Sequence, residues 1–433
     1  MRRNEQSFGI GIGMIAAAAI CLAATPAVLA ETWTQSGKIY ATDGVAGMNF
    51  GAAAGISGNT IVIGATDTAT GAAYVYTKDG AGDWGTEVRL SLADWTGVSD
   101  FGNGAAIDGN TIIIGANGST IGGVAGAGTA HIFDSDGMGG WTEMALLTAG
   151  ADAISDISFG ASVAISGDIA VVGASKYDDA SSNQGTAYVF GRNVGGTDNW
   201  GQIAKLTAGD PSNNAYFGSA MALDGDTAVI GAYNASKIYV FEDDGLGNWS
   251  ETIKIGSTSG TRFGISASID GDTAVAGAYY RAVGGKSRAG GATVLSRDLG
   301  GENAWGEVTA IVSPNGETNG YFGRTVAIDE GTIVVGAYGE DAGGLADAGA
   351  AYVFQADGSY LEMLLPDDAA DGDSFGRVVA LSGTTIVVTA PGANGLADGT
   401  GAVYVFEVVP EPSTLAMVIG LAVALALGYR SRR

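Results

Sequence analysis

Residues 159–174 read FGASVAISGDIAVVGA, and stretches of the same design recur so that the chain holds seven copies. Each copy has a Phe-Gly pair, a short apolar run, a tight polar turn and a run rich in Val and Ile. In six copies a Gly-Ala step begins 14 residues after the phenylalanine, whereas the seventh copy has Thr389-Ala390-Pro391 there. Successive phenylalanines lie 46 to 59 residues apart, and an internal period near 50 residues predicts an array of supersecondary units. The seven pairs are Phe50-Gly51, Phe101-Gly102, Phe159-Gly160, Phe217-Gly218, Phe263-Gly264, Phe322-Gly323 and Phe375-Gly376.

The third copy predicts four short antiparallel strands. Residues 162–165 and 169–172 are apolar runs on either side of a Ser-Gly-Asp turn, which is typical of a β-hairpin. Residues 185–190 (GTAYVF) form a third strand, and a fourth begins at Trp200. The second run is apolar at nearly every position, as expected for an inner strand that is buried on both faces. Seven such units predict an all-β fold, a seven-bladed β-propeller of four-stranded blades, rather than a β-sandwich or a β-solenoid.

The strand count also predicts how the ring closes. Six fourth strands begin at an aromatic residue, and the seventh such residue is Trp33, at the other end of the chain. The repeat region ends with residues 402–406, which read as a third strand. Pairing residues 33–40 with 402–406 would complete the last blade and remove an exposed sheet edge. The six aromatic residues are Trp84, Trp141, Trp200, Trp249, Trp305 and Tyr360.

The N-terminal 30 residues read as a secretory signal peptide. Two arginines precede an apolar stretch and a small-residue site, which predicts cleavage between Ala30 and Glu31. Cys21 lies inside the apolar stretch after the bulky Ile20, so a lipoprotein site is disfavoured. The exported chain would then contain no cysteine and no disulfide. We therefore predict three segments, a signal peptide over 1–30, a propeller over 31–408 and a sorting segment over 409–433.

The C-terminal segment has three parts in order. Pro410-Glu411-Pro412 precedes an apolar stretch over 415–429, which we read as a short transmembrane helix, and the chain ends in a cluster of arginines. This order resembles the PEP-CTERM sorting signal of Gram-negative bacteria. The resemblance implies recognition by an exosortase-type membrane protease in a host that makes exopolysaccharide. The protein would pass through transient inner-membrane anchoring to the cell surface or extracellular matrix, and a plain membrane anchor is the alternative.

The Phe-Gly and Gly-Ala skeleton resembles the FG-GAP repeat of integrin α-chain propellers and their bacterial relatives, over essentially all of residues 31–408. The family pattern ends in Gly-Ala-Pro, and only the last copy has the proline, Pro391. Many FG-GAP repeats bind calcium in an Asp-x-Asp-x-Asp-Gly loop between the first two strands. Here that loop is as short as Asp224-Gly225-Asp226, too short to surround a cation with six or more oxygens. Calcium at the seven hairpins is therefore not implied.

Charge and residue types narrow the chemistry. The chain has 46 acidic and 20 basic residues and a net charge of −26, which excludes nucleic-acid binding and contact with anionic lipid except through the C-terminal tail. We find no Gly-x-Ser-x-Gly elbow and no histidine cluster, and the single histidine, His131, takes the strand position of a tyrosine such as Tyr188. We therefore expect no catalytic residues, no enzyme activity and no cofactor, apart from weak calcium.

One acidic loop suggests a metal hypothesis. Asp367, Asp368, Asp371 and Asp373 lie within seven residues, and closely spaced carboxylates can hold a divalent cation. Glu340 and Asp341 lie in a neighbouring variable loop. A solvated acidic loop is the alternative interpretation.

Variation between the copies indicates where function lies. The loops between second and third strands, and those between blades, differ most, and in a four-stranded blade both emerge on one face. We predict a non-catalytic binding or adhesion module that uses this face to contact extracellular polysaccharide or surface proteins. Neutral drift of exposed loops is the alternative explanation of the variation. The alternative function is a secreted glycan-active hydrolase, which a cluster of carboxylates and aromatic residues at the channel mouth would favour.

Overall fold

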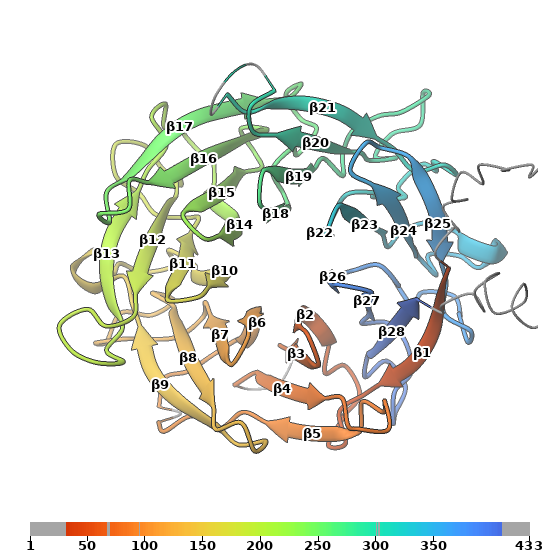
Figure 1. Cartoon of the computed structure of the whole chain (residues 1–433), viewed down its shortest axis with the longest axis horizontal. Helices are drawn as coiled ribbons and strands as arrows, with labels where there is room; N and C mark the ends of the chain where they lie inside the picture. The colour runs from red at the N-terminus through yellow and green to blue at the C-terminus, as the bar shows by residue number, and fades with distance from the viewer. Residues whose placement is uncertain (1–31, 67–69, 95, 300, 302–303, 409–433) are drawn as a thin grey trace, which may run out of the picture. The chain divides into compact units, whose positions relative to one another are not determined.

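The computed structural model describes residues 32–66, 70–94, 96–299, 301 and 304–408. These residues form seven four-stranded antiparallel sheets arranged radially around a central channel (Figure 1). The predicted seven-bladed propeller is therefore confirmed. The signal peptide, the cleavage site at Ala30 and Glu31, and the sorting segment with Pro410, Glu411 and Pro412 lie outside the described residues. No helix within the described ranges is long and apolar enough to cross a membrane.

Each blade runs from an inner strand at the channel to an outer strand at the wall. Blade 1 contains β2 (Phe50–Ser57), β3 (Thr60–Ala65), β4 (Ala72–Thr77) and β5 (Thr86–Arg89). Blade 2 contains β6 (Phe101–Asp108), β7 (Thr111–Ala116), β8 (Thr129–Ser135) and β9 (Trp141–Leu147). Blade 3 contains β10 (Phe159–Ser166), β11 (Ile169–Ala174), β12 (Thr186–Gly191) and β13 (Gly201–Leu206). Blade 4 contains β14 (Phe217–Asp224), β15 (Thr227–Ala232), β16 (Lys237–Asp243) and β17 (Trp249–Gly256).

The remaining blades follow the same order. Blade 5 contains β18 (Ala267–Asp270), β19 (Thr273–Gly277), β20 (Ala292–Ser296) and β21 (Gly306–Ile311). Blade 6 contains β22 (Val326–Asp329), β23 (Thr332–Ala337), β24 (Ala350–Gln355) and β25 (Tyr360–Leu364). Blade 7 contains β26 (Val379–Ser382), β27 (Thr385–Ala390), β28 (Ala402–Val408) and β1 (Trp33–Ile39). Two single-turn 3₁₀ helices, η1 (Gly150–Asp152) and η2 (Ala342–Gly344), lie in loops.

The ring closes as the strand count predicts. β1 pairs antiparallel with β28, with Trp33 opposite Val408 and Ile39 opposite Val403. The Trp33 side chain is 4% exposed and packs in the core of blade 7. The first described strand thus completes the last blade as its outer strand, and β28 is paired on both sides.

The Phe-Gly and Gly-Ala pairs are the two sides of one interface between blades. A Cβ atom added to Gly173 in blade 3 would lie 2.1 Å from the carbonyl oxygen of Gly218 in blade 4. The six Gly-Ala glycines all meet the next blade in this way, at 1.8 to 2.1 Å. In the seventh copy Thr389 lies against Gly51 of blade 1. The repeated pairs therefore exist because backbone must touch backbone between neighbouring blades.

The first hairpins also join the blades. The hairpin glycine has a φ between +52° and +54° in six copies and occupies the first loop position, as in type II′ turns. Its N–H donates to a serine or aspartate side chain at the end of the inner strand of the preceding blade. Six such bonds pair Ser57 with Gly109, Asp108 with Gly167, Ser166 with Gly225, Asp224 with Gly271, Asp329 with Gly383 and Ser382 with Gly58.

Candidate functional site

A group of tyrosines gathers on the variable-loop face of blades 4 to 6. Tyr216 and Tyr233 stack with ring centroids 5.2 Å apart, and Tyr321 and Tyr338 stack at 5.0 Å. The adjacent rings of Tyr279 and Tyr280 lie 5.9 and 6.2 Å from that of Tyr321. All six side chains are half-buried, so part of each ring is open to solvent. Tyr216 and Tyr321 stand directly before a repeat phenylalanine, and the other four stand one or two residues after a Gly-Ala step, which places them all at the start or end of the variable loops.

Arginines lie over these rings. The guanidinium of Arg377 lies 5.0 Å from the centroid of the Tyr338 ring, and that of Arg324 lies 5.8 Å from the Tyr279 ring. Further out, Arg262 lies over the Tyr233 and Tyr280 rings, and Arg288 lies 4.9 Å from Tyr280. We call this set, together with Arg281, which lines the adjoining pocket with Tyr280, the arginine–tyrosine surface. Its members are Arg262, Arg281, Arg288, Arg324, Arg377, Tyr216, Tyr233, Tyr279, Tyr280, Tyr321 and Tyr338.

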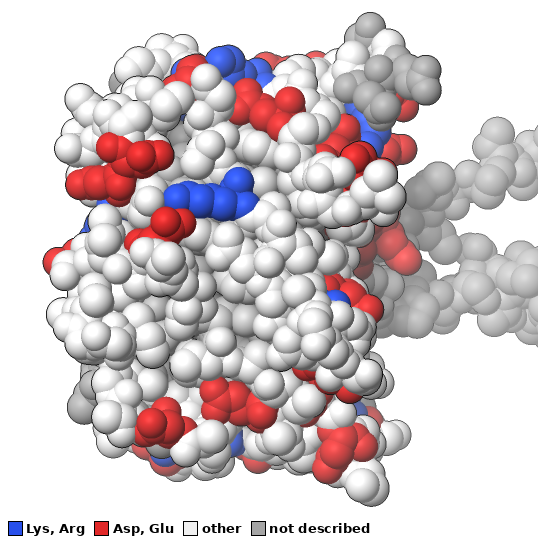
Figure 2. Space-filling view, turned by 90° about the vertical axis from the view of Figure 1, so that its left-hand side faces the viewer, with Lys and Arg blue, Asp and Glu red and all other residues white. Residues whose placement is uncertain are grey.

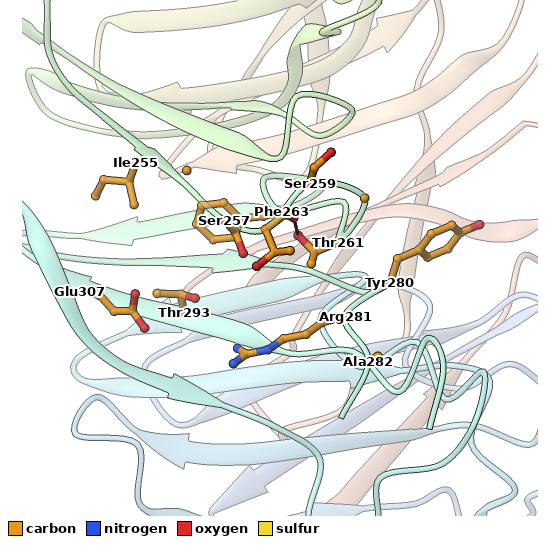
Figure 3. Close-up of a pocket in the computed structure, with 13 residues that line it drawn as sticks. Ile255, Ser257, Ser259, Thr261, Phe263, Tyr280, Arg281, Ala282, Thr293 and Glu307 are labelled. Carbon is orange, nitrogen blue, oxygen red and sulfur yellow. Dashed lines mark hydrogen bonds between the residues drawn. The ribbon is translucent and has the colours of Figure 1, made fainter. Parts of the chain in front are cut away.

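The arginines of this surface form no close ion pair in the described part of the chain, although Glu307 lines the pocket that Arg281 enters (Figure 3). Arg262, Arg281, Arg288, Arg324 and Arg377 form no ion pair within 4.0 Å with any described residue. Burial and the neighbouring Arg377 lower the pKa of Arg324 from its ordinary value. Burial and the neighbouring Tyr280 raise the pKa of Tyr279 to about 12, so this phenol is neutral at pH 7. The surface therefore carries net positive charge on aromatic supports.

The variable-loop end of the channel is lined mainly by small and hydroxyl-bearing residues. Arg324 and Arg377 are the charged side chains among the described residues that line this part, and no aspartate or glutamate is among them. Deeper in the channel an apolar waist follows, with one Ile or Leu from each blade. Asp108, Asp224 and Asp329 lie at the far end, where each accepts the hairpin bond of the next blade. The carboxylate cluster that would favour a hydrolase is absent from the described residues of the channel mouth.

A pocket of about 450 Å³ opens between blades 4 and 5, next to the arginine–tyrosine surface (Figure 3). In this blade Thr293 occupies the third-strand position that is tyrosine in five other blades, so no large ring fills the space. Figure 3 shows the Arg281 side chain extending toward Thr293 and Glu307, while Tyr280 points away from them. Hydroxyl groups from the linker between blades 4 and 5 line the rest of the pocket.

The predicted divalent site is not assembled in this structure. Asp368 forms an ion pair with Lys38 at 2.7 Å and accepts a hydrogen bond from the Tyr404 hydroxyl. Asp371 accepts from the N–H of Ala346, and Asp373 accepts from the N–H of Ala370. Asp367 donates its backbone N–H to the side-chain oxygen of Gln35. The described residues contain no group of three or more His, Cys, Asp or Glu side chains placed to hold a metal ion.

Some of these acidic side chains belong to a tyrosine–carboxylate pair that recurs in several blades. In five blades the third-strand tyrosine donates its hydroxyl to a carboxylate in a variable loop, and Asp368 is the acceptor in blade 7. Of the two acidic residues that the sequence singled out in the neighbouring loop, Glu340 is the buried acceptor of Tyr352, and burial raises its pKa. The other, Asp341, accepts from the N–H of Asp347. Both residues therefore have a structural partner. The pairs are Tyr74 with Asp43, Tyr188 with Asp152, Tyr239 with Asp210, Tyr352 with Glu340, and Tyr404 with Asp368.

His131 has the structural role that its position predicts. It is 2% exposed, packs edge-on against Phe101 at 5.5 Å, and lies 2.8 Å from Glu143 through Nδ1. Burial opposes ionisation of Glu143, but hydrogen bonds from His131 and the Ala93 N–H outweigh it and lower the pKa of this carboxyl. The histidine ring is smaller than a tyrosine ring, and a pocket of about 330 Å³ lies beside it.

Sequence reasoning predicted the variable-loop face as the binding surface and did not single out the tyrosines and arginines that lie on it. The missed signal is the set of positions at which copies four to seven differ from the first three. Tyr233, Tyr279 and Tyr338 follow the Gly-Ala step where the first three copies have Thr, Asn or Ser. Arg324 and Arg377 stand two residues after the repeat phenylalanine, a position occupied by Ala, Asn or Ala in the first three copies.

These observations define a seven-bladed β-propeller whose blades share one scaffold and differ at the channel mouth. The FG-GAP repeat model matches residues 33–76, 141–190, 200–245, 305–354 and 361–406, more than half of the chain. The chain therefore belongs to the FG-GAP repeat family. Each match begins at or near an outer strand and ends at or shortly after the third strand of the following blade. The repeat in sequence is therefore shifted by one strand from the blade in space, and the ring closes because β1 supplies the outer strand of blade 7. No curated protein matches the chain.

Solved structures share the fold at low sequence identity. A Lactobacillus plantarum protein is 15% identical, with a TM-score of 0.51 over 77% of this chain and 89% of its own. The periplasmic gluconolactonase of Pseudomonas aeruginosa is 13% identical, with a TM-score of 0.47 over 74% of this chain and 86% of its own. At 15% identity the likeness to the Lactobacillus plantarum protein concerns the fold alone.

Proposed function

We propose that this chain is an exported, non-catalytic propeller that binds extracellular polysaccharide through its variable-loop face. The observation that carries the proposal is the gathering of six half-buried tyrosines on that face in blades 4 to 6. Aromatic rings bury large areas at low cost in side-chain freedom and present a flat apolar face beside a polar hydroxyl. Sugar rings have the matching combination of flat C–H faces and hydroxyl edges. The adjoining pocket of about 450 Å³ supplies depth beside the aromatic area.

Removal of one central ring tests the proposal. We expect Tyr279→Ala to weaken polysaccharide binding about tenfold, which corresponds to about 1.4 kcal/mol, because Tyr279 contacts both Tyr280 and Tyr321. The measurement is affinity electrophoresis of the purified chain through gels that contain neutral or acidic polysaccharides. Tyr40→Ala is the matched control, because Tyr40 is 40% exposed and lies outside the surface. Migration of the native chain unaltered by every polysaccharide would count against the proposal, and capture of a surface protein instead would favour the protein partner.

Export and surface attachment are part of this proposal, and they are supported by the order of residues at the two ends of the chain. Removal of the signal peptide after Ala30, together with cleavage near Pro410 by an exosortase-type protease, would place the propeller at the surface or in the matrix of a Gram-negative cell. Prolines at 410 and 412 favour an extended segment that a protease cleft can accept. Mass spectrometry of the native protein is expected to find a chain from Glu31 to about Pro410. A C-terminus at Arg433 would instead indicate a retained membrane anchor.

A further inference from the structure

We infer that the arginine–tyrosine surface is a binding site for a carboxylate-bearing saccharide, which extends from the pocket between blades 4 and 5 to the channel mouth. This inference rests on the proposed function and adds the chemical class of the ligand. Three observations carry it, namely the arginines without acidic partners, the aromatic supports beneath them, and the continuity of the surface.

The lack of acidic partners is the first observation. The chain has more than twice as many acidic as basic residues, so a basic side chain will commonly lie near a carboxylate. Arg192 fits this expectation with three aspartates within 3.5 Å, and Arg297 fits it with Glu242 and Asp272 within 2.9 Å. The five arginines of the surface have no such partner among the described residues. Neighbouring guanidinium groups repel one another, and a bound carboxylate would relieve this repulsion.

The second observation concerns the supports. Stacking on tyrosine orients the planar guanidinium and leaves its N–H groups available. Beside the channel Arg377 lies over the Tyr338 ring at 5.0 Å, and Arg324 lies over the Tyr279 ring at 5.8 Å. Guanidinium groups bind carboxylates through two parallel hydrogen bonds, which gives both energy and direction. Arg281 adds a further guanidinium in the pocket, where Thr293 and Ser257 supply hydroxyl groups for sugar hydroxyls.

Continuity indicates a ligand of several units. Tyr280 lines the pocket and also lies beneath Arg262 and Arg288. Its ring is 4.4 Å from that of Tyr279, which lies beside Arg324 at the channel. A compact anion such as phosphate would occupy one arginine, whereas an oligosaccharide with carboxylates along its length could contact the pocket and the mouth together.

The rest of the molecule argues against a densely charged polymer. The wall of the ring carries separate groups of carboxylates among uncharged residues, as Figure 2 shows for one side. Repulsion by these groups is screened beyond about 8 Å at physiological salt, so it acts mainly on a polyanion that runs across the surface. Nucleic acid, with a charge on every phosphate, would meet more repulsion than a saccharide with separated carboxylates.

The experiment compares binding of a galacturonate hexamer and a neutral glucose hexamer to the full chain by isothermal titration calorimetry. We expect the native chain to bind the galacturonate hexamer, more weakly at high salt, and the neutral hexamer at least tenfold less tightly. The double variant Arg324→Gln/Arg377→Gln is expected to lose at least about tenfold in affinity for the acidic hexamer. Arg377→Lys is expected to recover only part of that loss in the presence of Arg324→Gln, since lysine lacks the planar fork.

One control variant and one further test variant separate an effect on binding from an effect on folding. Arg89→Gln removes an exposed arginine of blade 1, which pairs with Asp43 at 3.8 Å, and should leave the affinity unchanged. Arg288→Gln is a second test variant, because Arg288 belongs to the surface but is exposed and its loss should not disturb folding. A several-fold loss of affinity for the acidic hexamer is expected, and this result can be read even if the double variant does not fold. Unchanged affinity in the folded Arg variants, or equal binding of the two hexamers, would overturn the anionic ligand and leave glycan binding intact. Tighter binding of oligothymidylate or polyglutamate would overturn the saccharide class, and native chain that binds no glycan would contradict the proposed function as well.

Discussion

A chain without residues 32–42 is expected to lose the cooperative unfolding transition of the ring. The deletion removes β1, leaves β28 without its outer partner and takes Trp33, Ile39 and Ala41 out of the core. Loss of a buried tryptophan alone costs about 3 to 5 kcal/mol. With the other side chains and the strand pairing added, the loss approaches the whole stability of a typical domain, about 5 to 15 kcal/mol. The exposed β28 edge would also favour association with other chains.

Urea unfolding followed by near-ultraviolet circular dichroism, together with size-exclusion chromatography, measures both effects. Trp33→Ala should reproduce most of the loss of stability without changing the length of the chain. Thr34→Ala is the matched control, because Thr34 is the next residue in β1 and its side chain is exposed. A deletion variant that stays monomeric with the native midpoint would show that blade 7 is stable with three strands.

The fold could be predicted from the sequence because its main contacts are repeated. Gly173 meets Gly218 in the same way that Gly64 meets Gly102. The same contact between blades therefore recurs six times, and its two residue types recur with it in the sequence. The closure was predictable for the same reason, since a missing outer strand in one blade leaves a countable gap. Repetition makes a long-range contact visible in one sequence.

The candidate site could not be predicted because it consists of departures from the repeat. Nothing in the sequence shows that Arg377 has no carboxylate within reach, since this depends on how the loops of different blades fold. The partners of the acidic loop could not be predicted for the complementary reason. Asp368 accepts from Tyr404, which lies 36 residues later in the chain, and that pairing is invisible to local spacing. Asp368, Asp371 and Asp373 each accept a hydrogen bond from a different residue.

Substitution of one Gly-Ala glycine is expected to have an effect of similar size to the deletion of β1. In Gly173→Ala the new methyl group would lie 2.1 Å from the carbonyl oxygen of Gly218, well inside contact distance. The opposing atom is backbone, so it cannot rotate away as a flexible side chain would. Relief requires blades 3 and 4 to separate, which would expose the apolar cluster that joins them, including Val171 and Phe217. We expect a loss of more than about 3 kcal/mol, in the range of severe overpacking.

The matched control is Gly80→Ala, because Gly80 is exposed and a Cβ atom there would have no neighbour within 4 Å. Thermal unfolding of the two variants beside the native chain measures the difference. The seventh interface gives a second comparison, since Thr389 already occupies the Gly-Ala position there and only Gly51 opposes it. Gly51→Ala should therefore be severe, as its Cβ would lie 2.8 Å from that of Thr389, whereas Thr389→Gly should cost less because it leaves a gap rather than a clash. If Gly173→Ala unfolded at the native temperature, neighbouring blades would have to move apart by more than an ångström at little cost, and the glycine pairs could no longer explain why the motif repeats.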